Sequence, residues 1–137
     1  MVRFPSVTRL HYPNFGVHFH AYVSVKARRE GETRQVMLAL LGWDPYVKTV
    51  IAVDDDVYVN DDSQVMWAVA THFESHKEVL VIEGLPDNAL DLSASPTGTT
   101  SLMGLDALRV PGLDSVRAKV LAAALERATR LLKKAGR

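Results

Sequence analysis

Three consecutive aspartates, Asp54, Asp55 and Asp56, follow directly after the apolar run at 50–53. Ligands of open α/β sheets gather beyond the carboxyl ends of the strands, so carboxylates here could bind a hard cation or polarise a substrate. Carboxylates at a strand end also accept backbone N–H hydrogen bonds in the following turn. The sequence favours this turn-ordering role and leaves pairing with a partner protein and metal binding as alternatives.

Four of the five histidines are a second set of candidate ligands. His18 and His20 are expected to point the same way from one strand, and His72 and His76 have the i, i+4 spacing of one helix face. A zinc site needs three or four such ligands to converge. The segment THFESHKE is typical of a polar helix end, where histidines need no special role, so no metal site is predicted.

Other signatures of catalysis are absent from the sequence. It contains no Gly-x-Ser-x-Gly elbow, no GxGxxG after a strand and no GxxxxGK[ST]. The stretch SPTGTTS could cradle an anion with backbone amides and hydroxyls, but a flexible surface loop is the favoured interpretation. The sequence therefore contains no self-sufficient active site, and no catalytic residue is predicted.

The composition limits the class of protein. With 137 residues, 47% of them hydrophobic and 23% charged, the chain is typical of one globular domain. Sixteen basic and sixteen acidic side chains balance, which argues against nucleic acid or anionic lipid as a partner. There is no cysteine, and no apolar run approaches the roughly 20 residues of a membrane span. We expect a cytoplasmic protein that does not enter a membrane.

Hydrophobic periodicity places these candidates on alternating strands and helices. After an extended entry segment at 1–16, strands are predicted at 17–27, 46–53, 78–84 and 101–110, and helices at 33–42, 61–73 and 113–134. This order predicts an α/β fold, a single domain over 1–137 with a mainly parallel or mixed central sheet flanked by helices.

Some finer expectations concern individual residues. Alternation in the first long strand puts His18, His20, Tyr22, Ser24 and Lys26 on an uncovered side. Gly42 is expected to end the first helix, and Asp61, Asp62 and Ser63 to cap the second. Met66 is expected in the buried stripe of that second helix. EVLVIEG is expected to be a central strand, and the loop at 85–101 to be the most mobile segment.

The stretches HFHAYVSVK, DPYVKTVIAVDDDVYVNDDSQVMWAVATHF and SLMGLDA, in this order, resemble the C-terminal domain of the UbiD family of decarboxylases. The similarity runs from about Phe4 to Leu108 and is densest at the strand–aspartate–helix unit that contains Val65, Trp67 and Ala68. UbiD enzymes use prenylated FMN to remove or add a carboxyl group on aromatic and unsaturated acids.

This resemblance implies a division of labour between two parts. Family enzymes keep the prenylated flavin, its metal-bridged phosphate and the catalytic arginine and glutamates in a preceding domain, which the given sequence lacks. No cofactor is therefore expected on this chain alone, and prenylated FMN with its metal ion is expected in a partner. The C-terminal domain builds oligomer contacts and closes over the flavin site from one side. The resemblance puts these residues nearest to substrate: Leu85, Thr97, Gly98, Thr99, Thr100 and Ser101.

Three positions depart from the family pattern. His72 stands where the family usually has arginine, Leu102 replaces the usual lysine of the Ser-Lys-Met-Gly motif, and Leu108 replaces a usual threonine. The leucine at 102 indicates packing, against a partner or over an apolar substrate, in place of direct contact with phosphate or carboxylate.

Three hypotheses follow. The first is the small, non-flavin subunit of a split UbiD-type decarboxylase or carboxylase that works with a UbiD-like large subunit. The alternative is a non-catalytic, self-associating binding or assembly module, and the least favoured is an independent metal-dependent enzyme. In the first two, an oligomer is expected, Asp54–Asp56 order a turn or face a partner, and Trp67 anchors its helix in the core or at an interface.

Overall fold

The computed structural model describes residues 4–109 and 114–136, with the backbone alone for residues 114–121. Five strands form one mixed sheet in the order β1-β2-β3-β5-β4. β2, β3 and β5 are parallel, whereas the edge strands β1 and β4 run antiparallel to their neighbours. The strands are β1 (Val7–His11), β2 (His20–Val25), β3 (Thr49–Asp54), β4 (Val79–Pro86) and β5 (Thr99–Ala107).

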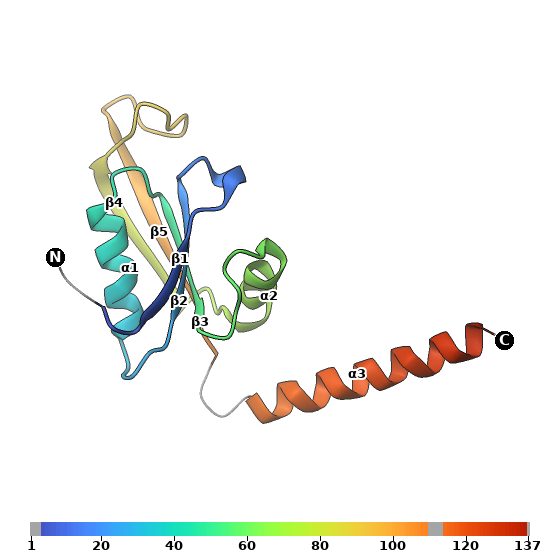
Figure 1. Ribbon diagram of the computed structural model, residues 1–137. Helices are drawn as coiled ribbons and strands as arrows, with labels where there is room; N and C mark the ends of the chain where they lie inside the picture. The colour runs from blue at the N-terminus through green and yellow to red at the C-terminus, as the bar shows by residue number, and fades with distance from the viewer. Residues whose placement is uncertain (1–3, 110–113, 137) are drawn as a thin grey trace.

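Helices cover both faces of this sheet (Figure 1). α1 (Glu32–Trp43) packs on one face and α2 (Asp62–His72) on the other. The predicted α/β class, a mixed sheet flanked by helices, is confirmed. Each face has its own apolar core because both helices bury a stripe against β3 and β5. The cluster under α1 includes Ala21, Val23, Val36, Met37, Val50 and Leu102, and the cluster under α2 includes Tyr22, Ile51, Val53, Val65 and Ala68.

β2 does not have the uncovered side that its alternation predicted. Residues 21–25 are all buried, because β2 lies inside the sheet with a helix on each face. Tyr22 packs in the cluster under α2, and the Ser24 hydroxyl donates to the carbonyl of Val57 at 3.3 Å. The strand begins only at His20, since Val17 and His18 both have positive φ angles (49° and 70°) and turn the chain beforehand.

The last two strands also lie in a different order from the prediction. EVLVIEG forms the edge strand β4, and β5, which follows it in the sequence, lies between β3 and β4. The register of β5 aligns Gly104 with Val50 on one side and Leu80 on the other. The chain therefore crosses from β3 through α2 to the edge and returns to the centre by a hairpin.

The helix ends are partly as predicted. Asp61 caps α2, because its Oδ1 accepts hydrogen bonds from the backbone N–H groups of Ser63 (2.9 Å) and Gln64 (3.4 Å). The prediction that Gly42 ends α1 is wrong: the helix continues to Trp43. The prediction that Met66 is buried is also wrong, since the side of α2 that faces the sheet is the side of Val65 and Ala68.

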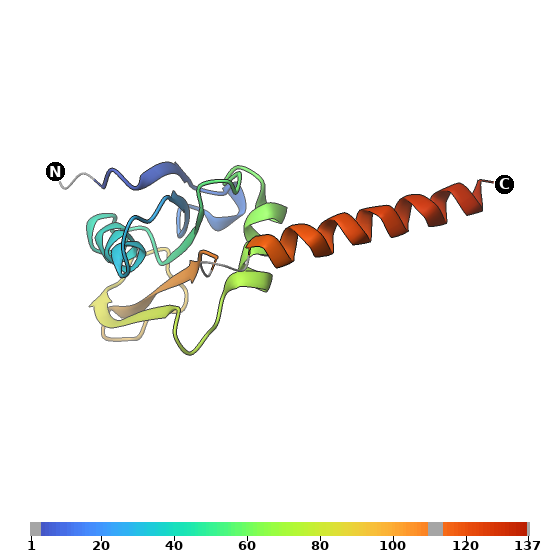
Figure 2. The same ribbon diagram turned by 90° about the horizontal axis from the view of Figure 1, so that it is seen from below.

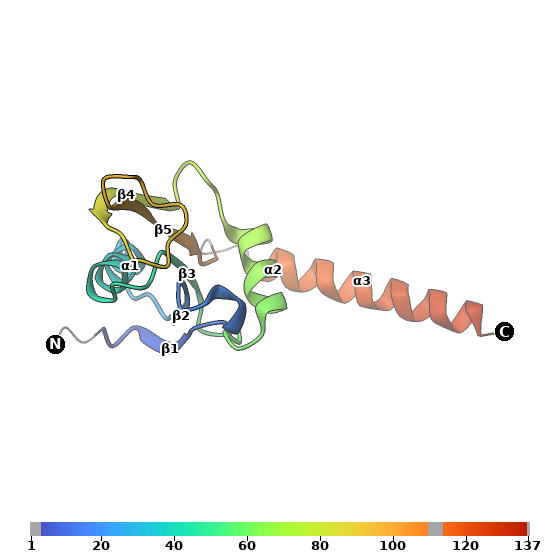
Figure 3. The same cartoon turned by 90° about the horizontal axis from the view of Figure 1, so that it is seen from above.

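α3 (Asp114–Ala135) projects away from the sheet in all three views (Figures 1, 2 and 3). Every residue from Ala122 to Gly136 is exposed. Across the described residues, no helix is both long enough and apolar enough to cross a membrane. At the other end of the chain, the entry segment contains β1 and a 3₁₀ turn at Asn14–Gly16.

Replacing Gly104 with alanine should lower the free energy of unfolding by about 1 kcal/mol, because overpacking outweighs the stiffer backbone. A Cβ at this position would lie 2.9 Å from Met37 Sδ and 3.3 Å from Met37 Cβ. Gly42→Ala is the matched control: a Cβ there meets nothing within 4 Å, and alanine is favoured in a helix. Urea denaturation measures both. Equal stability of the two variants would contradict this packing.

Candidate functional site

The aspartate triplet at the carboxyl end of β3 binds an arginine that comes from far along the sequence. Asp54 Oδ2 accepts hydrogen bonds from the backbone N–H (2.8 Å) and Nε (3.0 Å) of Arg109, and Asp56 Oδ2 lies 3.1 Å from its Nη2. Asp55 lies 3.8 Å from Lys26 Nζ at the surface. Asp54 and Asp56 therefore hold the segment that leaves β5 toward α3.

No metal site is formed by these groups. Among the described residues, no three histidine, aspartate or glutamate side chains are placed to share an ion. His18 does not point from a strand beside His20 but lies in the preceding turn, where its Nε2 is 3.1 Å from Asp44 Oδ2. α2 ends at His72, so His76 does not continue its helix face and instead pairs with Glu74 at 3.0 Å. The described geometry gives the metal-dependent hypothesis no support.

Asp106 is a half-buried carboxyl near the same end of the sheet. Burial raises its pKa, the hydrogen bond from the Leu108 N–H opposes this, and the nearby charges of Glu78 and Asp54 raise it further, to about 6. The carboxyl accepts that hydrogen bond at 3.2 Å. Asp106 is thus the group whose charge the fold disfavours near neutral pH.

A second concave site lies at the opposite end of the sheet, where the parallel strands begin. Phe19 precedes β2, Lys48 precedes β3, and Thr100 and Leu102 belong to the start of β5. Together with the end of α1 and the β4–β5 loop they enclose a cavity of about 200 Å³. Its other lining residues are Leu41, Gly42, Asp44, Pro45, Tyr46, Val47, Leu85, Pro86, Asn88 and Asp91.

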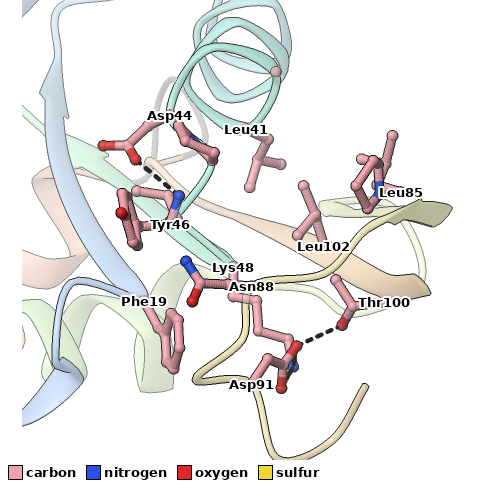
Figure 4. Close-up of a pocket in the computed structure, with 14 residues that line it drawn as sticks. Phe19, Leu41, Asp44, Tyr46, Lys48, Leu85, Asn88, Asp91, Thr100 and Leu102 are labelled. Carbon is pink, nitrogen blue, oxygen red and sulfur yellow. Dashed lines mark hydrogen bonds and ion pairs between the residues drawn. The ribbon is translucent and has the colours of Figure 1, made fainter. Parts of the chain in front are cut away.

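The two sides of this cavity differ in chemistry (Figure 4). Leu41, Leu85 and Leu102 form an apolar side, whereas Asp91 on the β4–β5 loop and Thr100 on β5 form a polar side. Leu102 is buried and belongs to the core cluster under α1. The leucine at this departure from the family pattern therefore packs within its own domain as well as facing the cavity.

The polar side is organised around Asp91. Its carboxylate accepts hydrogen bonds from Lys48 Nζ (2.8 Å and 2.7 Å to its two oxygens), from Thr100 Oγ1 (2.8 Å) and from the N–H of Ser93 (3.0 Å). The side chain of Asp91 is only 4% exposed. The ammonium of Lys48, followed by the hydroxyls, holds the pKa of Asp91 well below its usual range. The pair ties the β4–β5 loop to the start of β3.

The loop that the sequence predicted to be mobile is therefore extensively hydrogen-bonded. Beyond Asp91, the hydroxyl of Ser95 lies 2.7 Å from that of Thr97 and 2.9 Å from that of Thr99. Gly98 has a φ of 77°, which a glycine adopts without strain, and its N–H donates to the Ser95 carbonyl. The composition alone did not indicate this order because it depends on which hydroxyls face one another.

The residues that the family resemblance put nearest to substrate lie in two neighbouring hollows and in the loop between them. Leu85 and Thr100 line the cavity, and Thr99, Thr100 and Ser101 line a shallower hollow of about 300 Å³ on the other side of Lys48. Thr97 and Gly98 shape the loop between them. Trp67 is not in the core: it is partly exposed on α2, with its ring edge-on to that of His72 at 5.3 Å.

Sequence reasoning missed Lys48 and Asp91. Both carried a weak signal: Lys48 is the charged residue within the apolar run YVKTVIAV, and Asp91 lies between Leu90 and Leu92. A charge placed among apolar residues of a strand or loop often has a specific partner. The 43-residue separation hides which partner that is.

Comparison with known proteins places the chain in a family. The sequence profile of the 3-octaprenyl-4-hydroxybenzoate carboxy-lyase C-terminal domain, UbiD_C, matches residues 1–107. An anhydromevalonate phosphate decarboxylase from Methanothermobacter thermautotrophicus is 38% identical over 88 residues, which are 64% of this chain and 21% of that protein. The chain spans about a fifth of the length of the curated relatives it matches.

Solved structures agree with this assignment. The UbiD-class enzyme HmfF from Pelotomaculum thermopropionicum, in complex with FMN, has a TM-score of 0.73 and 32% identity, covering 80% of this chain and 25% of that one. The open form of Sedimentibacter hydroxybenzoicus vanillic acid decarboxylase, ShVdcCD, has a TM-score of 0.70 and 28% identity, covering 90% and 30%. From its sequence profile, its relatives and its fold, the chain belongs to the UbiD family and contains the family's C-terminal domain.

Proposed function

We propose that this chain is the small, non-flavin subunit of a split UbiD-type decarboxylase or carboxylase that acts on aromatic or unsaturated carboxylic acids. A UbiD-like large subunit binds prenylated FMN and its metal ion, and this domain forms the side of the active site that faces the flavin. The observation that carries the proposal is the cavity at the amino ends of the parallel strands, which is lined by Leu85 and Thr100, two of the six residues expected next to substrate.

The described residues do not fit a complete flavin site. The cavity of about 200 Å³ is below the roughly 300–1,000 Å³ of sites that enclose a cofactor. Lys48, which could meet a phosphate, is already paired with the nearly buried carboxylate of Asp91. We therefore assign no chemical step to this chain and expect the flavin to be held elsewhere.

What the chain can contribute is shape and the exclusion of water. Leu41, Leu85 and Leu102 offer an apolar surface to the hydrocarbon part of a substrate, and the Asp91–Lys48 pair keeps the neighbouring loop in place without presenting a net charge. An apolar surface that excludes water from the active site strengthens the electrostatic interactions that groups on the opposite side make with the substrate. The Sedimentibacter enzyme is known in open and closed forms, which supports a wall that moves as a unit.

The tip of the β4–β5 loop is the proposed point of contact with the large subunit. Leu92 is fully exposed and Leu90 largely so, although Asp91 between them is nearly buried. A fixed loop that holds two leucines in water is pre-organised for an apolar pocket on a partner, since little entropy is lost on docking.

Co-expression with a UbiD-like large subunit tests the proposal. Both chains should elute together in size exclusion with the absorbance of the flavin, and Leu90→Arg/Leu92→Arg should weaken the complex by about 100-fold. Leu10→Arg on β1, also exposed and also apolar, is the matched control and should leave elution unchanged. Separate elution of the two wild-type chains, with a large subunit fully active alone, would leave the non-catalytic assembly module as the better function.

A further inference from the structure

The cavity at the amino ends of the parallel strands has room for one aromatic ring. Its volume is about 200 Å³, and an engineered cavity of about 150 Å³ lined by leucine, isoleucine and phenylalanine binds benzene. In Figure 4 the ring of Phe19 lies across the cavity from the three leucines of the apolar side. The backbone of Phe19 is fixed, because its carbonyl accepts hydrogen bonds from the N–H groups of Lys48 (2.8 Å) and Thr49 (2.9 Å). The cavity walls can therefore pack against both sides of a ring.

The charged groups that line the cavity disfavour a carboxylate. Two of them are the carboxylates of Asp44 and Asp91, and among the described residues of the lining Lys48 is the only cation. The Lys48 ammonium lies 2.7 Å from Asp91 and also donates to the hydroxyl of Ser93. A ligand carboxylate would thus meet two negative charges and one positive charge that is already paired. Like charges at such distances repel, so the lining selects against anions.

Asp44 keeps its negative charge although its side chain is only 10% exposed. Burial raises the pKa of this carboxyl, but hydrogen bonds from the Tyr46 N–H (3.0 Å), His18 Nε2 (3.1 Å) and the Tyr12 hydroxyl (3.1 Å) lower the pKa by more. The ring of His18 also stacks on that of Tyr12 at 4.2 Å. A carboxylate that is fixed by three donors cannot turn away from an anionic ligand.

Asn88 gives the cavity a hydrogen-bond donor that no described residue uses. Its Oδ1 accepts from the Leu90 N–H at 3.0 Å, which fixes the orientation of the amide. No described residue accepts a hydrogen bond from its Nδ2. In Figure 4 this amide lies on the side of Phe19 and Tyr46, away from the leucines. An ether, hydroxyl or amide oxygen on a ring could accept a hydrogen bond from Nδ2.

We propose that this cavity binds an uncharged compound of one ring with an accepting oxygen, and that it excludes carboxylates. The proposal rests on the proposed function for the origin of the ligand. Decarboxylation takes up one proton and releases carbon dioxide, so a carboxylate substrate becomes an uncharged product. The cavity then holds the end of the substrate farthest from its carboxyl group, and the carboxyl group itself lies toward the large subunit. The same cavity binds the product more tightly than the acid.

Titration of the whole chain alone, followed by ¹H–¹⁵N NMR, tests the charge selection. Benzamide and benzoate have nearly the same shape and differ in charge. Benzamide should shift the amide signals of Leu41, Lys48 and Thr100 with a Kd on the order of 1 mM, as expected for a ligand of this size. Benzoate should bind at least about 10-fold more weakly.

Two variants locate the site. Leu85→Trp fills the cavity with a larger side chain and should abolish the shifts, whereas Leu10→Trp, on β1 and outside the cavity lining, should leave them unchanged. Asn88→Asp keeps an acceptor for the Leu90 N–H but loses the amide donor. Anisole and ethylbenzene differ by an oxygen in place of a methylene group, and the preference of the chain for anisole should fall about threefold in Asn88→Asp.

Three results would overturn the inference. The first is benzoate that binds as tightly as benzamide. The second is a set of shifts that survives Leu85→Trp, and the third is no shift with benzamide at about ten times the expected Kd. Because the titration uses this chain alone, its failure leaves co-elution with the large subunit as a separate result, and a failure of co-elution leaves this binding site in place.

Discussion

Replacing Asp91 with alanine is expected to open the β4–β5 loop. The substitution removes the carboxylate that accepts hydrogen bonds from Lys48, Ser93 and Thr100. The side chain of Lys48, which is only 24% exposed, then lacks its counterion. An unpaired, partly buried charge is more costly than the loss of the pair itself. Limited proteolysis should therefore cut within residues 87–98 about 10- to 100-fold faster than in the wild type, with the rest of the fold intact.

Two variants make this expectation specific. Asp91→Asn keeps one oxygen, which can accept from either Ser93 or Thr100, but it loses the ion pair, so its cleavage rate should be intermediate. Asp87→Asn changes an exposed carboxylate in the same loop and should cleave like the wild type. Mass spectrometry of the fragments locates the cut. If Asp91→Ala is cleaved no faster than Asp87→Asn, the ion pair does not hold the loop.

The Asp91–Lys48 ion pair also predicts how the stability of the β4–β5 loop depends on pH. The pKa of Asp91 is depressed in the folded chain, so its stabilising contribution is present above the ordinary pKa of about 4 and is lost only as the pH falls through the lower, folded value. The wild-type loop should accordingly resist proteolysis by an acid protease at pH 4, whereas the Asp91→Ala loop should be cleaved there as readily as at pH 7.

Asp106→Asn is expected to raise the free energy of unfolding by about 2 kcal/mol at pH 8. Burial, with the charges of Glu78 and Asp54, raises the pKa of Asp106 to about 6, so the folded chain disfavours its charged form. The stabilising contribution of Asp106 to the free energy of unfolding is therefore fully present below about pH 4, and it is lost as the pH rises through about 6. Asparagine stays neutral and can still accept the Leu108 N–H.

Urea denaturation of both chains from pH 4 to pH 8 measures the effect. The difference between Asp106→Asn and wild type should be near zero at pH 4, grow through pH 6 and level off above it. Asp87→Asn, which removes the same charge from the surface, should show no such trend. A difference that is constant with pH would show that Asp106 contributes by packing and not by its charge.

Local features of the fold could be predicted from the sequence because they depend on neighbouring residues. The cap at Asp61 requires only its own side chain and the next helical turn. The strand β3 could be predicted from a β-branched apolar run. The resemblance of the strand–aspartate–helix unit then gave the family, which the comparisons support.

Features that depend on distant pairing could not be predicted in this way. EVLVIEG looks like a central strand, but the partner that makes it an edge strand, β5, comes 15 residues after the end of that stretch. Asp54 finds Arg109 and Lys48 finds Asp91 only once the sheet register is set. The alternation of residue types predicted that Tyr22 and Ser24 face solvent, because this pattern cannot show that a second helix covers them.

The central claim, that this domain completes a decarboxylase site held mainly by another chain, is tested most directly by reconstitution. The flavin-loaded large subunit is titrated with this chain, and decarboxylation of an aromatic or unsaturated acid is followed by release of carbon dioxide. The account predicts no turnover by either chain alone and a rate that rises and saturates at an equimolar ratio. Full turnover by the large subunit alone, or decarboxylation by this chain that persists through repurification, would contradict it.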